Sequence, residues 1–156
     1  MIKRTICQDV FIENNLLNGD ILSKIKDKIL ELKSTCSTDN GYIMEVCDNI
    51  EILDNIVSEN GVFVKVQFSI KAFKPMINNK YDCVVKLIYS QYILGTILGQ
   101  TDILIDCHNL KDFKFVKGNN TFSNGKDEIK VGSNIEAKIT MMKFINQKFN
   151  CIGTLI

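Results

Sequence analysis

The chain has 156 residues, of which 46% are hydrophobic and 24% are charged, and its formal net charge at neutral pH is +1. This is the composition of an ordinary globular protein, and the net charge is too small to diagnose nucleic-acid binding by itself. The N-terminus lacks the apolar core of a signal peptide, and no apolar run approaches the roughly 20 residues of a membrane span, so we expect a soluble, intracellular protein.

The six cysteines are scattered along the chain without a C-x-x-C pair, and there is a single histidine. A zinc site typically needs ligands clustered at short spacing, so we expect no metal site and no other cofactor. Most of the cysteines lie in apolar, strand-like segments, where the side chain packs as a small hydrophobe. A reducing compartment fits this pattern.

A helix is predicted over residues 20–34, where apolar side chains return every three or four positions. Asp20 stands where its carboxylate can accept a hydrogen bond from the free amides of the first turn. Four side chains form the apolar stripe: Leu22, Ile25, Ile29 and Leu32. We expect this apolar stripe to pack against a sheet.

Three strands are predicted around this helix, over residues 5–12, 42–46 and 62–73. In the last of them, apolar and polar side chains alternate strictly. Alternation over this length indicates one buried face and one exposed face, which is typical of an antiparallel sheet. The first half of the chain is therefore predicted to lay one helix on a small antiparallel sheet.

The second half is predicted to contain five short strands and no helix. The strands are expected over residues 81–89, 92–98, 101–106, 134–144 and 148–156. Regularly spaced short strands imply a barrel or a sandwich. The longest loop lies between the third and fourth strands, and this arrangement fits an OB-type barrel.

Pro75, the only proline, lies between the two halves. Proline cannot donate a hydrogen bond to a sheet, so it belongs at a strand end. The charge also changes sign near it: residues 1–75 carry 9 Lys or Arg and 11 Asp or Glu, whereas residues 76–156 carry 10 Lys and 7 Asp or Glu. We predict an α+β protein with an N-terminal helix-on-sheet domain, residues 1–78, and a C-terminal five-stranded OB-type barrel, residues 79–156.

Three short motifs follow one another in the first half of the chain: Gly41-Tyr42-Ile43, Asp48-Asn49-Ile50 and Phe73-Lys74-Pro75. Five barrel strands come next, and the last of them contains F-N-C-I-G-T-L-I. No single motif is specific. The ordered series, over essentially the whole chain, resembles the seventh-largest subunit of eukaryotic RNA polymerase II, its archaeal counterpart and the paralogues in the other nuclear polymerases.

This resemblance implies a non-catalytic stalk subunit of a DNA-dependent, multisubunit RNA polymerase. The first domain would dock as a tip at the base of the polymerase clamp, touching the largest subunit and a small shared subunit. The barrel would contact nascent single-stranded RNA during transcription. The sequence leaves open whether a fourth-subunit-like stalk partner is present and which RNA sequences are preferred.

Two departures from the family pattern mark this sequence as a divergent member. The family's glycine in the first barrel hairpin is replaced, and the chain stops at Ile156 without the usual acidic and aromatic tail. Together with the composition rich in Ile, Lys and Asn, these departures suggest a polymerase encoded by a large DNA virus. Such a protein would work in the host cytoplasm and the virion, and a cellular version in the nucleus.

The segment of residues 45–59, interpreted as a loop, carries five carboxylates and no Lys or Arg. Aliphatic side chains recur among these carboxylates, and exposed aliphatics suit a docking surface. The alternative is a solvated turn. The predicted docking residues are Asp48, Asn49, Ile50, Glu51, Ile52 and Ile56.

The segment of residues 109–130 interleaves lysines with phenylalanines. Lysines neutralise phosphates and aromatic rings stack on unpaired bases, so the pattern favours single-stranded RNA. The alternative is a lysine-rich loop whose phenylalanines plug the barrel end. OB-type barrels bind strands across their second and third strands, which adds two tyrosines and the histidine. The predicted RNA-binding residues are Tyr89, Tyr92, His108, Lys111, Phe113, Lys114, Phe115 and Lys117.

We expect no catalytic site. Cys107 and His108 are adjacent, but neighbours on a strand point to opposite faces and cannot form a nucleophile–base pair. The sequence also lacks a phosphate-binding glycine loop and an H-E-x-x-H motif. The alternative function is a free-standing module that binds single-stranded RNA in translation or RNA decay, with the first domain serving another partner.

Overall fold

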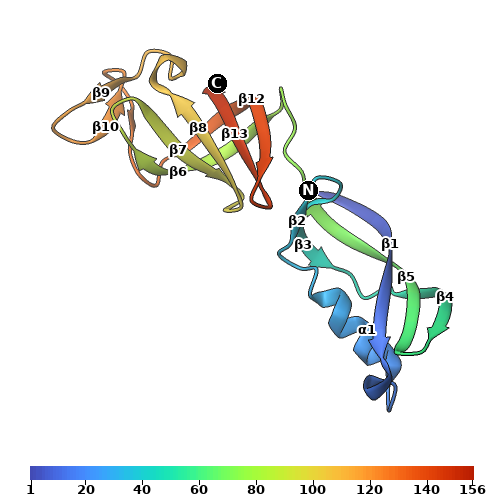
Figure 1. Cartoon of the computed structure of the whole chain (residues 1–156). Helices are drawn as coiled ribbons and strands as arrows, with labels where there is room; N and C mark the ends of the chain where they lie inside the picture. The colour runs from blue at the N-terminus through green and yellow to red at the C-terminus, as the bar shows by residue number, and fades with distance from the viewer. The chain divides into compact units, whose positions relative to one another are not determined.

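The computed structural model describes all residues, 1–156, and the chain divides into two compact units, Met1–Lys74 and Pro75–Ile156 (Figure 1). The division falls at the proline, a few residues before the boundary expected after residue 78. None of the helices combines the length and the apolar character that crossing a membrane requires. Each unit is described by itself.

The first unit is a five-stranded antiparallel sheet with one α-helix. Its elements are β1 (Ile2–Glu13), the 3-10 turn η1 (Asn14–Leu16), α1 (Ile21–Leu30), β2 (Cys36–Ser37), β3 (Gly41–Val46), β4 (Glu51–Ser58) and β5 (Gly61–Phe73). The central strand is β5, which pairs with β1 along one edge and with β4 and β3 along the other. The short strand β2 adds to β3.

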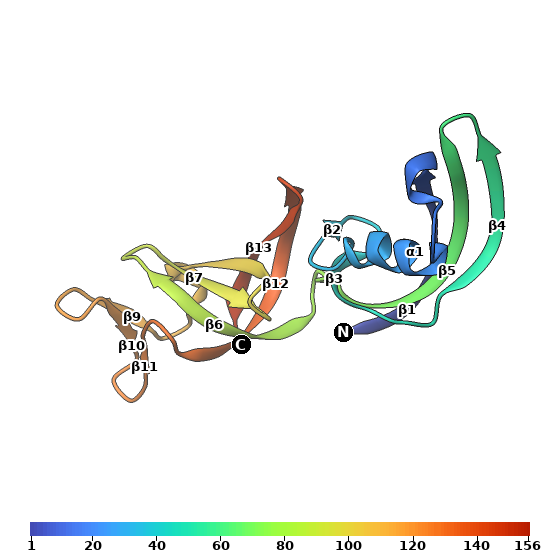
Figure 2. The ribbon, with the colours of Figure 1, turned by 90° about the horizontal axis from the view of Figure 1, so that it is seen from below.

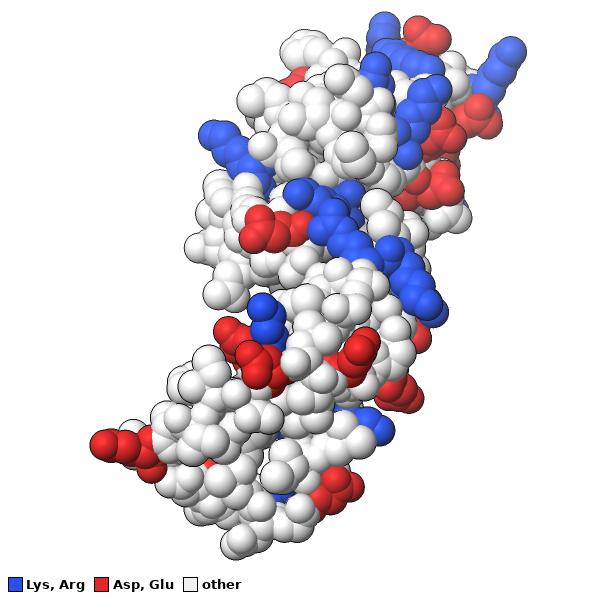
Figure 3. Space-filling view, turned by 90° about the vertical axis from the view of Figure 1, so that its right-hand side faces the viewer, with Lys and Arg blue, Asp and Glu red and all other residues white.

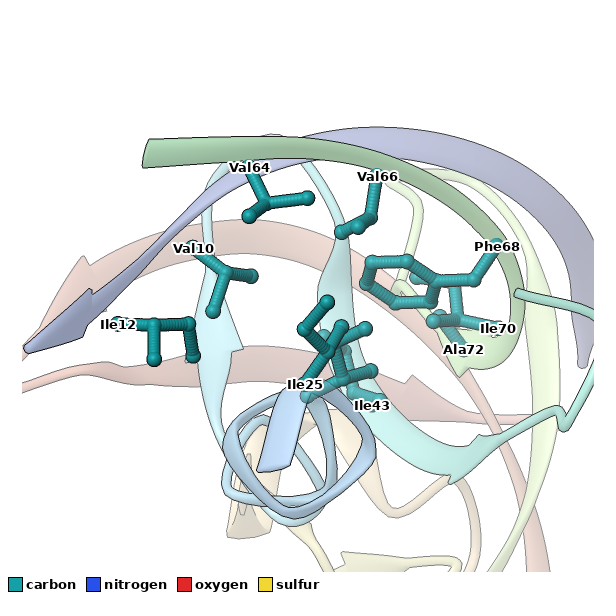
Figure 4. Close-up of a cluster of buried hydrophobic side chains, with 10 residues drawn as sticks. Val10, Ile12, Ile25, Ile43, Val64, Val66, Phe68, Ile70 and Ala72 are labelled. Atoms are coloured by element: carbon teal, nitrogen blue, oxygen red, sulfur yellow. The ribbon is translucent and has the colours of Figure 1, made fainter. Parts of the chain in front are cut away.

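The alternation in β5 builds the core of this unit. Five alternating apolar side chains of β5 are at most 5% exposed: Val64, Val66, Phe68, Ile70 and Ala72. Ile25 and Ile29 of α1 belong to the same cluster, which also takes in β1 and β3 (Figure 4). Each aliphatic side chain withdrawn from water in this way contributes roughly 1.5–3 kcal/mol.

The helix α1 begins where the sequence predicts and ends earlier. Asp20 caps it as expected, because its Oδ1 accepts a hydrogen bond from the backbone N–H of Ser23 at 3.3 Å. The predicted helix ran to residue 34, but α1 ends at Leu30. The chain must leave the helix because Ser34, with a φ of 70°, donates its N–H to the carbonyl of Ile43 at 2.9 Å and so joins β3.

The interpretation of residues 45–59 as a loop is wrong for its larger part. Residues 51–58 form β4, which runs antiparallel to β5 as one arm of a hairpin at the edge of the sheet (Figure 2). The hairpin turns just before Gly61, where a Cβ would clash with the carbonyl oxygen of Ile12. Glycine is therefore required for β1 to approach the turn.

The second unit contains a closed five-stranded barrel. Its elements are β6 (Lys80–Ile88), β7 (Tyr92–Ile97), β8 (Thr101–Asp106), the 3-10 turn η2 (Cys107–Asn109), β9 (Lys114–Val116), β10 (Thr121–Ser123), β11 (Glu128–Ile129), β12 (Asn134–Ile145) and β13 (Lys148–Leu155). The barrel order is β6-β7-β8-β13-β12, closed by β12 against β6. Only β8 and β13 pair in parallel.

The predicted five-stranded barrel is thus confirmed, and the connectivity is consistent with an OB fold. The long segment between β8 and β12 was expected to be a loop. It contains a small sheet of its own, in the order β11-β10-β9. Three of its apolar side chains are buried, namely Leu110, Phe122 and Ile129, so the segment is packed rather than free.

Two thiols lie in the barrel core, Cys83 on β6 and Cys151 on β13, and burial raises the pKa of both from 9.0 to about 11. The unfolded chain ionises these thiols at lower pH than the folded chain. Their contribution to stability is therefore complete below about pH 9 and is lost as the pH rises towards about 11.

We predict that the melting temperature of the barrel falls over this pH interval and that a Cys83→Ala/Cys151→Ala variant shows a shallower fall. Thermal unfolding followed by circular dichroism from pH 8 to about 11 measures the difference. Cys7→Ala is the control, because Cys7 is exposed and should leave the profile unchanged. Identical profiles for the double variant and the parent would contradict the prediction.

Candidate nucleic-acid interface

Tyr89 and Tyr92 lie together at one end of the barrel, and η2, which carries His108, lies next to the loop between them. Tyr89 follows β6 and Tyr92 opens β7, and the centroids of their rings lie 4.8 Å apart. The backbone N–H of Cys107 donates to the carbonyl of Gln91 at 2.8 Å, which ties η2 to the loop between the tyrosines. Tyr89 is 48% exposed and His108 is exposed. The result is an accessible aromatic patch built from two loops.

The lysines of the predicted interface are available for an anion. Lys111, Lys114 and Lys117 are exposed, and none of them forms an ion pair. By contrast, Lys86 on β6 is bound to Asp102 on β8, with 3.1 Å between Nζ and Oδ1. Lys111 lies between η2 and β9, Lys114 opens β9, and Lys117 directly follows it.

The phenylalanines of the same segment are less available. Phe113 and Phe115 are both half-buried. Phe115 pairs across the small sheet with Phe122, which is 1% exposed, and the two ring centroids are 5.5 Å apart in an edge-to-face arrangement. For Phe115 this geometry favours the packing alternative considered from the sequence over stacking on a base.

An apolar groove of about 320 Å³ follows the outer surface of β7, β8, β12 and β13. Most of its lining is aliphatic or thioether, from Leu94, Leu104, Met141, Met142, Ile145 and Ile152. No aromatic ring lines it, and its one cation is Lys143. The groove thus lacks a stacking platform, and the tyrosine end of the barrel is the better candidate for unpaired bases.

The predicted docking residues of the first unit divide into two groups. Asn49 is held in place, because its Oδ1 accepts the backbone N–H of Ser69 at 3.0 Å and its Nδ2 donates to the Ser69 hydroxyl at 2.9 Å. Ile50 is half-buried and packs against the core of the unit. The remaining residues are exposed: Asp48, Glu51, Ile52 and Ile56.

Strand β4 adds apolar residues that the sequence analysis did not single out. All eight of its residues are exposed, among them Leu53 at 45% and Val57 at 77%. The strand pairs only with β5, so its other edge has no partner. Figure 3 shows uncharged surface between separate charged side chains at the lower end of the face drawn. The dipeptide Asn60-Gly61, a strong hairpin signal, could have revealed the strand.

The sequence-based reason for excluding a Cys–His pair is wrong in one respect. It placed Cys107 and His108 on a strand, but β8 ends at Asp106 and both residues belong to η2. In a 3-10 turn neighbouring side chains do not alternate between two faces. The side chains of residues 106–108 consequently lie close together.

Comparison with known proteins assigns no family. No family model matches the chain, and no curated protein matches it. Among solved structures, the apo form of Mycoplasma genitalium RNase R is similar, with 27% sequence identity and a TM-score of 0.42. The matched part covers 51% of this chain and 13% of that chain. At this TM-score the likeness carries no conclusion about fold or function.

The packing of the small sheet leads to a prediction about stability. Phe122→Ala should lower the free energy of unfolding of the barrel by about 3–5 kcal/mol, because the ring is fully buried. Phe115→Ala should lower it by less, and Tyr89→Ala should have little effect because that ring is largely exposed. Urea unfolding of the three variants measures the order. A Tyr89→Ala loss as large as that of Phe122→Ala would show that the tyrosine is a packing residue.

Proposed function

We propose that this protein binds single-stranded RNA through its barrel unit, at the end formed by the β6–β7 loop, η2 and β9. The observation that carries the proposal is the accessible pair of Tyr89 and Tyr92 beside His108, followed in the chain by unpaired lysines. Aromatic rings stack on bases of any sequence, and lysines neutralise the phosphates that link them. The OB-type connectivity supports this reading for the β6–β7 loop, because such barrels bind oligonucleotides with the loop between their first two strands.

The chemistry of this surface is that of a binding protein without a catalytic site. Binding through stacking and charge neutralisation has little sequence preference. A module of this kind serves translation or RNA decay as well as it serves transcription. The ligand and the binding surface are therefore proposed without a choice among these cellular processes.

We predict that Lys114→Ala/Lys117→Ala makes binding less dependent on salt. Each lysine–phosphate contact releases counterions and adds about 0.7 to the slope of log affinity against log salt for a single strand, so losing two contacts should flatten the slope by about 1.4. Tyr89→Ala should instead weaken binding by about 1–3 kcal/mol with little change in slope, because stacking releases no counterions. Fluorescence anisotropy with a labelled oligonucleotide of mixed sequence measures both effects.

The matched control is Lys3→Ala/Lys33→Ala, which removes two exposed lysines from the first unit. This control should leave both affinity and slope unchanged. If the control flattens the slope as much as the barrel variant, binding is a general charge effect. If the folded parent protein shows no binding at low salt, the RNA proposal fails.

A second candidate function is favoured by strand β4. The protein would be a stalk subunit of a multisubunit RNA polymerase, docking with β4 at the clamp base against the largest subunit and a small shared subunit. Two facts support this candidate: the ordered motifs that resemble the seventh-largest-subunit family, and an edge strand whose eight residues are all exposed. An edge strand with exposed aliphatics is a liability unless a partner covers it.

The surface beside β4 has the features of an anchoring site. A cavity of about 150 Å³ opens between β4 and the start of α1, lined by Leu17, Ile21, Ile52 and Val62, among others. Ile56, on the opposite side of the strand, is 66% exposed. Apolar pockets flanked by exposed aliphatics are where partner side chains contribute most to affinity.

We predict that Ile52→Asp/Ile56→Asp releases the protein from polymerase. Each apolar side chain buried at an interface contributes roughly 1.5–3 kcal/mol, which corresponds to about a ten- to hundredfold loss of affinity per substitution. Affinity purification of the tagged chain, with the largest polymerase subunit identified by mass spectrometry, measures the loss. Circular dichroism shows whether the variant is folded.

Val131→Asp is the matched control, since Val131 is an aliphatic residue of the barrel unit with 57% exposure. It should leave co-purification intact. Ile50 is unsuitable for this test because it packs against the core, and Ile50→Asp would unfold the unit. If polymerase co-purifies equally with the parent and with the folded double variant, β4 is not the docking strand.

A further inference from the structure

We propose that Asp106, Cys107 and His108 form a binding site for one Zn²⁺ ion. The three residues offer a carboxylate, a thiol and an imidazole, and their ligand atoms all lie within 4.8 Å of one another. Asp106 is the last residue of β8, and Cys107 and His108 are the first two residues of η2. The inference is independent of the proposed RNA binding, because it concerns only the metal chemistry of this turn.

The distances suit a single ion. Zinc–ligand bonds are about 2.3 Å to sulfur and about 2.0–2.2 Å to nitrogen or oxygen, so ligand atoms in a tetrahedral site stand about 3.3–3.6 Å apart. Side chains whose ligand atoms are at most 4.8 Å apart reach that spacing by small rotations about their side-chain bonds.

The turn is fixed by hydrogen bonds before any ion arrives. Oδ1 of Asp106 accepts the backbone N–H of His108 at 2.9 Å, and the N–H of Cys107 donates to the carbonyl of Gln91 at 2.8 Å. The hydroxyl of Thr154 donates to the carbonyl of Asn109 at 3.3 Å, which fastens the other end of η2 to β13. A rigid turn lowers the entropy lost when its side chains converge on an ion.

The donor set selects the metal. A thiolate together with an imidazole favours zinc over calcium or magnesium, which prefer oxygen ligands. His108 is exposed, so water has access to the fourth position of a tetrahedral site. Asp106 forms no ion pair with a lysine, and its carboxylate is not neutralised by one. The expectation of no metal site rested on the scattered cysteines and the single histidine, and did not consider a mixed set of ligands on a turn.

The test uses the full chain, which contains a single histidine, so its imidazole proton signals identify His108 without assignment. We expect addition of Zn²⁺ to shift these signals with a stoichiometry of one. Co²⁺ should produce a thiolate-to-metal absorption band in the near ultraviolet, also with a stoichiometry of one. Circular dichroism should be unchanged throughout the titration.

Three substitutions probe the ligands. Cys107→Ser should abolish the thiolate band, and His108→Gln should weaken Co²⁺ binding by more than about tenfold, because losing a residue that only orients a ligand already costs that much. Asp106→Asn keeps the acceptor for the His108 N–H but is a poorer ligand, so binding should weaken while the turn stays formed. Cys47→Ser is the control, since it removes a half-buried thiol of the first unit and should change nothing.

The proposal is overturned if Zn²⁺ leaves the histidine signals in place, or if the thiolate band survives Cys107→Ser. It is also overturned if Cys47→Ser removes the band, or if binding appears only as the protein unfolds. None of these readouts uses RNA. A failed zinc titration therefore leaves the RNA-binding proposal standing, and a failed RNA experiment leaves the zinc site standing.

Discussion

The pairing of β8 with β13 is the one parallel contact in the barrel, and the candidate nucleic-acid interface takes its position from that pairing. Residues 150–153 of β13 pair with residues 102–105 of β8. At Gly153 a Cβ would lie 2.6 Å from Cδ1 of Ile103 and 2.7 Å from the carbonyl oxygen of Lys138, so a larger residue would push the strands apart. Because β8 is held there, its end meets the β6–β7 loop, and η2 comes to lie beside the tyrosines.

In the first unit, the residues that support the fold differ from the exposed residues of the proposed docking strand. Ser69 lies on the polar side of β5, yet it is 3% exposed because Asn49 covers it with two hydrogen bonds. Asn49 and Ile50 thus fix the segment that leads into β4. Ile52 and Ile56, on the strand itself, are exposed and do not belong to the core cluster. A surface whose exposed residues do not support the core can change without unfolding the unit, as a partner-specific surface requires.

The sequence predicted what depends on periodicity and missed what depends on turns. Strict alternation over residues 62–73 identified β5 and its buried face, and five regularly spaced apolar segments identified the barrel. The hairpin at Gly61 was missed because β4 has no buried face, so its pattern resembles a loop. Helix α1 was predicted too long because its composition gives no sign of the hydrogen bond from Ser34 to β3. The sequence named Tyr89 and Tyr92 as RNA-binding residues, which stays a prediction, and only the structure shows that their rings lie side by side.

Binding at the two candidate surfaces should depend on salt to different degrees. The lysines of the barrel end would act through the charge of a phosphate chain, and such binding weakens steeply as salt rises. Strand β4 carries carboxylates, but its exposed aliphatics would supply most of the docking energy, and hydrophobic contacts lose little to screening. Contact with RNA could then be gained and released many times while the first unit stayed attached to a partner. This independence is possible because the lysines of the barrel end and strand β4 lie on separate units.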